Sequence, residues 1–133
     1  MSEGNRQEDR YLRGWKNLAA IHPEAGPALM EALRDIAPDL GRYVVEFPYG
    51  DVYAREGLSL KEREMVTVAS LITQGHPQSQ LKSHIRAALN VGCTRGEIVE
   101  IIIQMAVYAG FPAALNAAMT AQDVFKELDA KEG

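Results

Sequence analysis

Residues 94–121, TRGEIVEIIIQMAVYAGFPAALNAAMTA, decide the predicted fold, because they encode two helices and the turn between them. Thr94 and Glu97 have the spacing of a capping box, in which each side chain accepts a hydrogen bond from the other residue's backbone amide. Gly110 predicts the end of the first helix. Pro112 predicts the start of the second, because a residue in the first turn of a helix needs no partner for its amide.

The helix that follows Thr94 is apolar on nearly every side, so we expect it to be buried on every side. A chain of 133 residues has little room for such a helix. The next helix is rich in alanine, whose small side chain permits close helix packing. These features favour an obligate oligomer, and a compact monomer with this helix at its centre is the alternative. Glu100, Gln104 and the break at Gly110 argue against a membrane span.

Similar signals predict helices in the rest of the chain. Ser59 and Glu62 form a second capping box, and Gly75 predicts the end of the helix that it opens. Pro77 predicts the start of a helix that ends near Val91, with Gly92 as its cap. The expected helices span residues 3–20, 23–37, 38–47, 59–74, 77–91, 94–109 and 112–128.

Residues 48–51, Pro-Tyr-Gly-Asp, have the composition of a turn, and residues 49–57 are expected to be a short, partly ordered connector. The chain has no strand-like alternation between turns. The sequence therefore predicts an all-α fold with a single domain over residues 1–133.

Composition limits the class of function. The formal net charge of −4 argues against nucleic-acid binding, which needs a positive surface to neutralise phosphates. One cysteine cannot form an intramolecular disulfide, and the polar start of the chain is unlike a signal peptide. We expect a cytoplasmic protein whose partner is a small molecule, with no nucleic acid and no membrane.

Two inward-facing polar residues are the first candidates for chemistry. His84 aligns with Leu81 and Ala88, so it faces inward, where a core histidine is the alternative; imidazole exchanges protons near neutral pH. Glu64 aligns with Val68 on an apolar line, where a carboxylate must be paired, lie at the rim or shift its pKa. A solvated face or an internal pair with Arg63 is the alternative for Glu64.

Arginines and aromatic residues form a second set of candidates. Arg55, Arg63 and Arg86 could each bind an anion, because a guanidinium engages both oxygens of a carboxylate. Arg63 and Arg86 lie on polar stripes, so surface solvation is the alternative. Aromatic side chains could line a pocket or belong to the core: Trp15, Tyr49, Tyr53 and Tyr108.

Metal and thiol chemistry have weaker support. His22, His76 and His84 include no pair at ligand spacing on one helix, so the sequence predicts no metal site. Cys93 precedes a helix cap, which could lower its pKa, but no histidine adjoins it in sequence. A buried, inert cysteine is the preferred interpretation.

Four stretches resemble the carboxymuconolactone decarboxylase family in combination and in order. They are residues 47–58 (FPYGDVYAREGL), 60–69 (LKEREMVTVA), 84–98 (HIRAALNVGCTRGEI) and 108–114 (YAGFPAA). The resemblance covers about residues 45–126. It implies an alkyl hydroperoxidase D-like helical fold around a central helical hairpin, assembled into a trimer or hexamer. The redox relatives carry Glu…Cys-x-x-Cys-x-x-x-His, which matches Glu64 and His84 here, but Pro77 and Gln80 occupy the two cysteine positions.

The resemblance therefore implies a carbon–carbon lyase without a cofactor that acts on a small lactone or carboxylate such as 4-carboxymuconolactone, in the breakdown of aromatic compounds. His84 would act as acid or oxyanion donor and Glu64 would orient it. Arg55 or Arg63 would hold a spectator carboxylate. Trp15, Tyr53 and Tyr108 would form an apolar wall. The alternatives are a non-catalytic oligomer that binds small molecules and, with less support, a peroxidase of the same superfamily.

Overall fold

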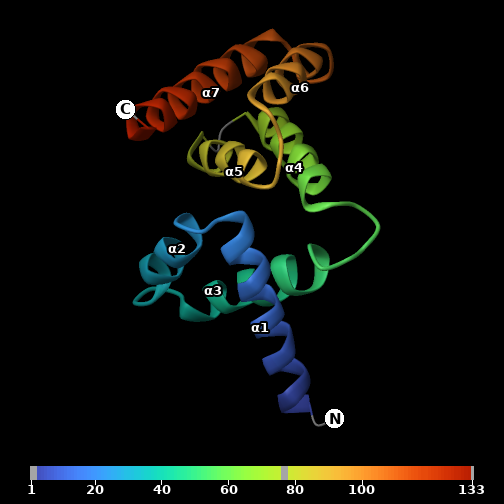
Figure 1. Ribbon diagram of the computed structural model, residues 1–133, viewed down its shortest axis with the longest axis vertical. Helices are drawn as coiled ribbons and strands as arrows, with labels where there is room; N and C mark the ends of the chain where they lie inside the picture. The colour runs from blue at the N-terminus through green and yellow to red at the C-terminus, as the bar shows by residue number, and fades with distance from the viewer. Residues whose placement is uncertain (1–2, 76–77, 133) are drawn as a thin grey trace. The chain divides into compact units, whose positions relative to one another are not determined.

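The computed structural model describes residues 3–75 and 78–132, and all regular secondary structure in them is helical (Figure 1). The chain forms two compact units, residues 1–60 and 61–133. The all-α prediction is confirmed. The expectation of a single domain stays a prediction.

The first unit contains three α-helices and one π-helix. These are α1 (Glu3–Ile21), α2 (Ala25–Leu33), α3 (Pro38–Val44) and the π-helix η1 (Val45–Val52). Helix α1 packs closely on η1, since a side chain at Gly14 would bring its Cβ within 2.0 Å of the carbonyl oxygen of Val45. The predicted helix over residues 23–37 is shorter in the structure, where it ends at Leu33.

The prediction of a turn at residues 48–51 was wrong, whereas residues 53–57 of the predicted connector are non-helical, as expected. Residues 45–52 are helical, and Tyr53 N donates to Pro48 O over 2.7 Å, the five-residue step of a π-helix. Side chains of α1 hold this segment: Arg13 donates to Gly50 O over 2.5 Å, and Asn17 donates to Tyr49 O over 2.7 Å. These tertiary hydrogen bonds override the local turn preference of the sequence.

The second unit contains helices α4 (Leu60–Gln74), α5 (Gln78–Asn90), α6 (Arg95–Tyr108) and α7 (Phe111–Glu132). Its core consists mainly of apolar side chains from all four helices, including Val68, Ile85, Ile98 and Val124, each 0% exposed. The predicted helices match closely, although α7 extends four residues beyond 128. The predicted start at Pro77 lies outside the described residues.

Local signals in the second unit act as predicted. Thr94 Oγ1 accepts from Glu97 N over 3.0 Å, and Glu97 Oε1 accepts from Thr94 N over 2.9 Å, which completes the capping box. The three glycines predicted to end helices all have positive φ: Gly75 (79°), Gly92 (106°) and Gly110 (98°). A residue with a side chain is strained in this conformation, so these positions fix where the helices stop.

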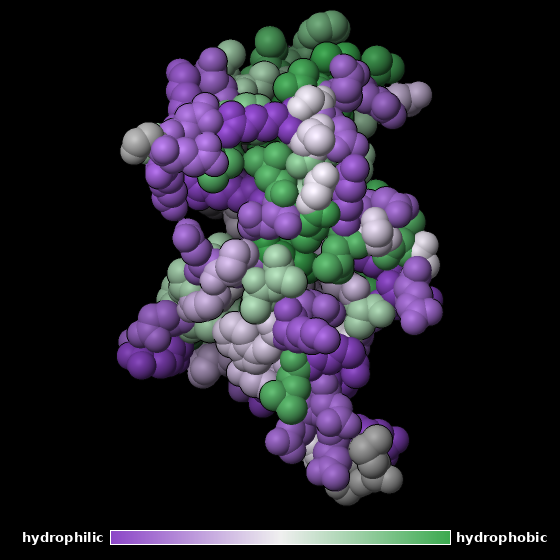
Figure 2. Space-filling model, in the orientation of Figure 1, coloured by the Kyte–Doolittle hydropathy of each residue, from purple (hydrophilic) through white to green (hydrophobic). Residues whose placement is uncertain are grey.

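Within the single chain, the helix after Thr94 is buried on one face, so its burial on every side stays a prediction that depends on assembly. Helix α6 buries only Ile98 and Ile102, and Val99, Ile103 and Val107 on its other face are 43%, 57% and 75% exposed. The apolar surface is visible over the turn between α6 and α7, at the top of Figure 2. The single chain covers one face of this helix only.

Most alanines of α7 face the core of the second unit. Ala114, Ala117 and Ala121 are buried in the core of the second unit, so their small side chains bring α7 close to helices of the same chain. None of the described helices is long and apolar enough to cross a membrane. The cytoplasmic location stays a prediction.

Candidate functional site

Helices α4 and α5 each carry one polar residue on the face that packs into the core. On α4, Glu64 lies one turn before Val68 and two turns before Ile72, and both of these are buried. On α5, His84 lies three residues after Leu81 and four before Ala88, which are also buried. Residues three, four and eight apart share a helix face, so the apolar stripes that join the helices also bring the two polar side chains together.

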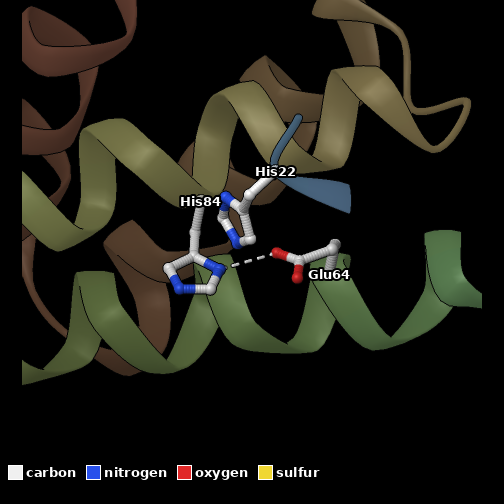
Figure 3. Close-up of side chains that lie close together, drawn as sticks. All are labelled: His22, Glu64 and His84. Carbon is white, nitrogen blue, oxygen red and sulfur yellow. Dashed lines mark hydrogen bonds and ion pairs between the residues drawn. The ribbon is translucent and has the colours of Figure 1, made fainter. Parts of the chain in front are cut away.

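Glu64 and His84 form a direct pair (Figure 3). Nδ1 of His84 lies 2.9 Å from Oε2 of Glu64. The Glu64 side chain is 0% exposed and that of His84 is 15% exposed. The carboxylate is therefore enclosed, and the imidazole is the member of the pair that retains contact with solvent.

The pairing sets the chemistry that the imidazole can perform. A carboxylate only accepts hydrogen bonds, so with Glu64 ionised the Nδ1–H of His84 is the donor. Nε2 is then the ring nitrogen that can exchange a proton with a bound molecule. In Figure 3 this second nitrogen points away from Glu64. The alternative of a solvated face does not describe this carboxylate, because Glu64 is buried.

The other face of α5 is held by α7. Lys82 and Arg86, one turn apart on α5 and on either side of His84, both pair with Glu127 of α7. Each oxygen of the Glu127 carboxylate receives one of the two cations. The three side chains are about two-fifths exposed, at 35%, 40% and 41%. Arg86 thus belongs to a contact between helices, and its binding of an anion stays a prediction.

The structure places the remaining predicted site residues on several elements. Arg63 is half-buried on α4, next to Glu64 in sequence, and Tyr108 is 77% exposed at the end of α6. Arg55 is exposed in the segment between η1 and α4. Tyr53 and Trp15 are half-buried in the first unit.

The aromatic residues of the first unit contact one another. Tyr53 stacks on Tyr49 with ring centroids 5.0 Å apart, and Trp15 meets the edge of Tyr11 at 6.3 Å. Within the second unit, a hydrogen bond joins the two predicted catalytic residues, Glu64 and His84. The proposed roles of the others stay predictions.

Cys93 is a buried thiol, as the sequence analysis preferred. It is 5% exposed, and Sγ donates a weak hydrogen bond to Thr94 O at 3.7 Å. Burial, followed by the nearby Glu97 carboxylate, raises the pKa of the Cys93 thiol. The thiolate is the nucleophilic form, so this environment suppresses thiol chemistry at Cys93.

Glu127 is the residue that the sequence analysis missed. The sequence does show its two partners, because Lys82 and Arg86 are four residues apart and therefore lie on one positively charged stripe of the helix. Nothing in the sequence selects Glu127 from the other acidic residues that could face this stripe, since the pairing spans 45 and 41 residues of chain. A search for the acidic partner of a two-cation stripe would have narrowed the choice to exposed positions on neighbouring helices.

Comparison with known proteins places these features in a family context. The profile of the carboxymuconolactone decarboxylase family matches residues 38–123. A 4-carboxymuconolactone decarboxylase from Acinetobacter baylyi is 37% identical over 122 residues, 91% of this chain and 90% of that protein. An uncharacterised 15.0 kDa protein from Paracoccus denitrificans is 33% identical over 117 residues, 87% of each chain. The nitrosuccinic acid decarboxylase npaB of Metarhizium robertsii is 33% identical over 85 residues, 64% of this chain and 59% of that protein.

Proposed function

Because the chain belongs to the carboxymuconolactone decarboxylase family, we propose that it is a cofactor-independent decarboxylase of small lactone or carboxylic acids. The observation that carries the proposal is the hydrogen bond between His84 and the buried Glu64. Two relatives with different acid substrates in their names are both decarboxylases, which supports the reaction type more than any one substrate. We take 4-carboxymuconolactone as the first substrate to test.

The reaction needs no cofactor if the substrate itself accepts the electrons. The bond between the carboxylate carbon and the ring breaks, and carbon dioxide leaves. The electron pair of that bond moves through the adjacent double bond into the lactone carbonyl, which becomes a dienolate oxyanion. A proton then adds to carbon, so that the sum of the reaction is exchange of a carboxylate for hydrogen. The protein must stabilise the oxyanion and deliver the proton.

In this proposal His84 performs the proton delivery. Its Nδ1 is engaged with Glu64 Oε2, so Nε2 is the atom that donates to the dienolate oxygen or carbon. Glu64 fixes the ring orientation and stabilises the imidazolium form that the reaction requires. A positioned general acid contributes roughly 10²–10⁴-fold, and a hydrogen bond to a developing oxyanion adds several kcal/mol.

The remaining predicted residues have supporting roles in the proposal. Arg55 or Arg63 would hold a second carboxylate of the substrate through a two-point contact. Trp15, Tyr53 and Tyr108 would supply apolar surface, which disfavours the charged carboxylate relative to neutral carbon dioxide. Peroxidase activity through a thiol pair has no support, because Cys93 is the one cysteine and its thiol is buried.

The proposed assembly is a homo-oligomer, a trimer or hexamer with an alkyl hydroperoxidase D-like helical arrangement. Support comes from a surface that we call the α6–α7 apolar face. Its members recur every four residues along each helix, and they are Val99, Ile103 and Val107 on α6 and Phe111, Leu115 and Met119 on α7. Their exposed fractions lie between 43% and 75%. Monomeric proteins seldom expose so continuous an apolar surface.

The decisive experiment measures carbon dioxide release from 4-carboxymuconolactone by the purified protein and two variants of His84. We expect His84→Ala to lower kcat by roughly 10²-fold or more. His84→Gln keeps a hydrogen-bonding group of similar size near Glu64 but cannot act as an acid, so we expect the same loss with less disturbance of the fold. Gln80→Ala, one turn earlier on α5 and exposed, is the matched control.

Each outcome has a clear meaning. Full turnover by folded His84→Gln would rule out the proton-delivery role. Absence of turnover by the unaltered, folded protein on lactone and oxo acids, with retained binding of them, would favour the non-catalytic small-molecule-binding alternative. Turnover that disappears only in the His84 variants would establish both the reaction and the residue.

A further inference from the structure

The first unit contains a cavity of its own, formed by helices α1, α2 and α3. Its volume is about 350 Å³, which falls in the range of roughly 300–1,000 Å³ that small-molecule sites occupy. The residues that line it come from positions 11–42. Half of them, Tyr11, Trp15, Met30 and Arg34, precede residue 38, where the family match begins.

One wall of the cavity is aromatic. Tyr11 and Trp15 lie one turn apart on α1, and their rings meet edge to face, with centroids 6.3 Å apart and planes at 77°. Met30 of α2 adds a polarisable thioether to the lining. Gly41 packs closely against this thioether, because a Cβ there would lie 3.0 Å from Met30 Sδ. This surface suits a flat, apolar ring, which gains stacking energy and contact with sulfur.

The rest of the lining is charged, with two guanidinium groups, Arg34 and Arg42, against one carboxylate, Asp39. Arg42 is engaged by acids of its own unit, at 3.6 Å from Asp39 and 3.3 Å from Glu46. Arg42 is thereby partly neutralised. The excess positive charge of the lining therefore falls mainly on Arg34.

Arg34 has only weak competitors for its guanidinium. It lies 3.3 Å from Glu31 and 3.9 Å from Asp35, whose side chains are 68% and 95% exposed. Ion pairs this exposed contribute about 0–1 kcal/mol, so an incoming anion can replace them. A carboxylate attached to a ring on the aromatic wall could be held by the Arg34 guanidinium at two points.

We propose that this cavity binds a small aromatic monocarboxylate, with the ring against Trp15 and Tyr11 and the carboxylate at Arg34. Benzoate is the simplest member of this class. The site consists of residues of the first unit alone, and neither Glu64 nor His84 belongs to it. Trp15 is the residue that it shares with the proposed apolar wall of the decarboxylase site, so Arg34, which belongs to this cavity alone, distinguishes the two sites.

Trp15 is the one tryptophan of the chain, so tryptophan fluorescence reports directly on the cavity. The first experiment titrates the protein with benzoate and follows that emission. Benzamide, which has the ring without the charge, and cyclohexanecarboxylate, which has the charge without the aromatic ring, are the comparison ligands. We expect saturable quenching by benzoate and roughly tenfold weaker binding of each comparison ligand, which corresponds to about 1.4 kcal/mol. No saturation with benzoate, or equal affinity for benzamide, would overturn the proposal.

Variants locate the binding. Arg34→Gln alters a side chain that is 68% exposed, so it should fold, and we expect it to lose roughly tenfold in benzoate affinity. Arg6→Gln, an exposed position on α1 outside the cavity lining, is the matched control and should bind as the unaltered protein does. His84→Gln should also leave the quenching unchanged. Loss of benzoate binding in His84→Gln with retention in Arg34→Gln would move the ligand to the other unit and contradict the proposal.

Discussion

Nδ1 of His84 lies 2.9 Å from Oε2 of Glu64, and the Glu64 side chain has no exposed surface. A carboxylate without solvent contact depends on its hydrogen-bond partners, and removal of a partner leaves a costly buried charge. An imidazole held at one nitrogen by such a carboxylate has a fixed orientation. The relationship therefore links the stability of the second unit to the alignment of the group that we propose for proton delivery.

The first prediction concerns Glu64→Gln. The amide keeps the size of the carboxylate and can still accept a hydrogen bond from Nδ1, but it cannot stabilise an imidazolium ion by charge. We expect kcat for decarboxylation to fall roughly 10²-fold, within the range for general acid catalysis, while the helical circular dichroism stays unchanged. Glu62→Gln, two residues earlier and exposed on the same helix, should retain full kcat and serves as the control.

A double variant separates orientation from an independent role of Glu64. If Glu64 acts through His84, adding Glu64→Gln to His84→Gln should cause little further loss, because the two residues work as a unit. Losses that multiply would mean that Glu64 contributes without His84, and the positioning role would then be wrong.

The second prediction concerns Glu127, which pairs with Lys82 and Arg86 on either side of His84. Glu127→Gln should release α5 from α7, and we expect kcat to fall more than KM changes, because the ring is less well aligned. The stability cost should be about 1 kcal/mol at most, since all three side chains are partly exposed.

The control for Glu127 is Asp129→Asn. Asp129 lies on the same helix and pairs with Arg95 of α6 at 2.7 Å, so its loss removes an ion pair to α7 without touching α5. We expect a similar change in the urea midpoint for the two variants, with the fall in kcat confined to Glu127→Gln. If the two variants had equal kcat values, the role of Glu127 would be purely structural.

Much of the second unit could be predicted from the sequence because its signals are local. The capping box of Thr94 and Glu97 and the glycines with positive φ act within a few residues, and they place the helix ends correctly. The inward positions of Glu64 and His84 followed from helical spacing. The sequence pattern offered Arg63 as a partner of Glu64 and the family resemblance added His84, and the structure shows the Glu64 carboxylate 2.9 Å from His84.

Long-range contacts explain what the sequence did not predict. Residues 48–51 have the composition of a turn, yet Arg13 and Asn17, more than 30 residues away, bind the backbone of Gly50 and Tyr49 inside a π-helix. The partner of Lys82 and Arg86 was equally remote. For α6, the sequence pattern reports which faces are apolar, and it does not report whether the same chain or another copy covers them.

The third prediction tests the close contact of α1 with η1. A Cβ on Gly14 would lie 2.0 Å from Val45 O, a backbone atom that cannot rotate away. We expect Gly14→Ala to destabilise the first unit by about 3 kcal/mol or more, as a severe case of overpacking. Gly4→Ala, on the same helix and with nothing within 4 Å of its Cβ, should be neutral or slightly stabilising. Urea denaturation followed by tryptophan fluorescence measures both, and equal midpoints would contradict the helix contact.

The fourth prediction concerns acid stability. Arg10 donates to both oxygens of Asp51, over 3.0 Å and 2.7 Å, and this hydrogen bonding lowers the pKa of the Asp51 carboxyl. A carboxyl whose pKa is lower in the folded state stabilises the fold above its unfolded pKa of about 3.9, and the contribution disappears as the pH falls through the folded pKa. Asp51→Asn should therefore be less stable than the unaltered protein at pH 7, and the difference should shrink below about pH 4.

Urea midpoints at a series of pH values test this pattern. Asp9→Asn, at an exposed position on α1, is the control for removal of a carboxylate from the same unit. The urea midpoints of Asp51→Asn and the unaltered protein could instead differ by the same amount from neutral to acid pH. That result would show that the ion pair with Arg10 does not contribute in the expected way.

The fifth prediction concerns the α6–α7 apolar face. Val107, near the end of α6, is 75% exposed, and Phe111, at the start of α7, is 71% exposed. If copies of the chain associate through this face, the unaltered protein should sediment as a species several times heavier than the 14.6 kDa chain. Val107→Lys places a charge in the contact and should shift the protein toward a single chain, because an unpaired buried charge is costly.

The control for Val107 is Gln122→Lys, which adds the same charge at an exposed polar position of α7. It should sediment as the unaltered protein does. A monomeric unaltered protein would contradict the proposed assembly altogether. An oligomer that survives Val107→Lys unchanged would place the contact elsewhere, and the exposed stripe on α6 would then need a different partner to explain it.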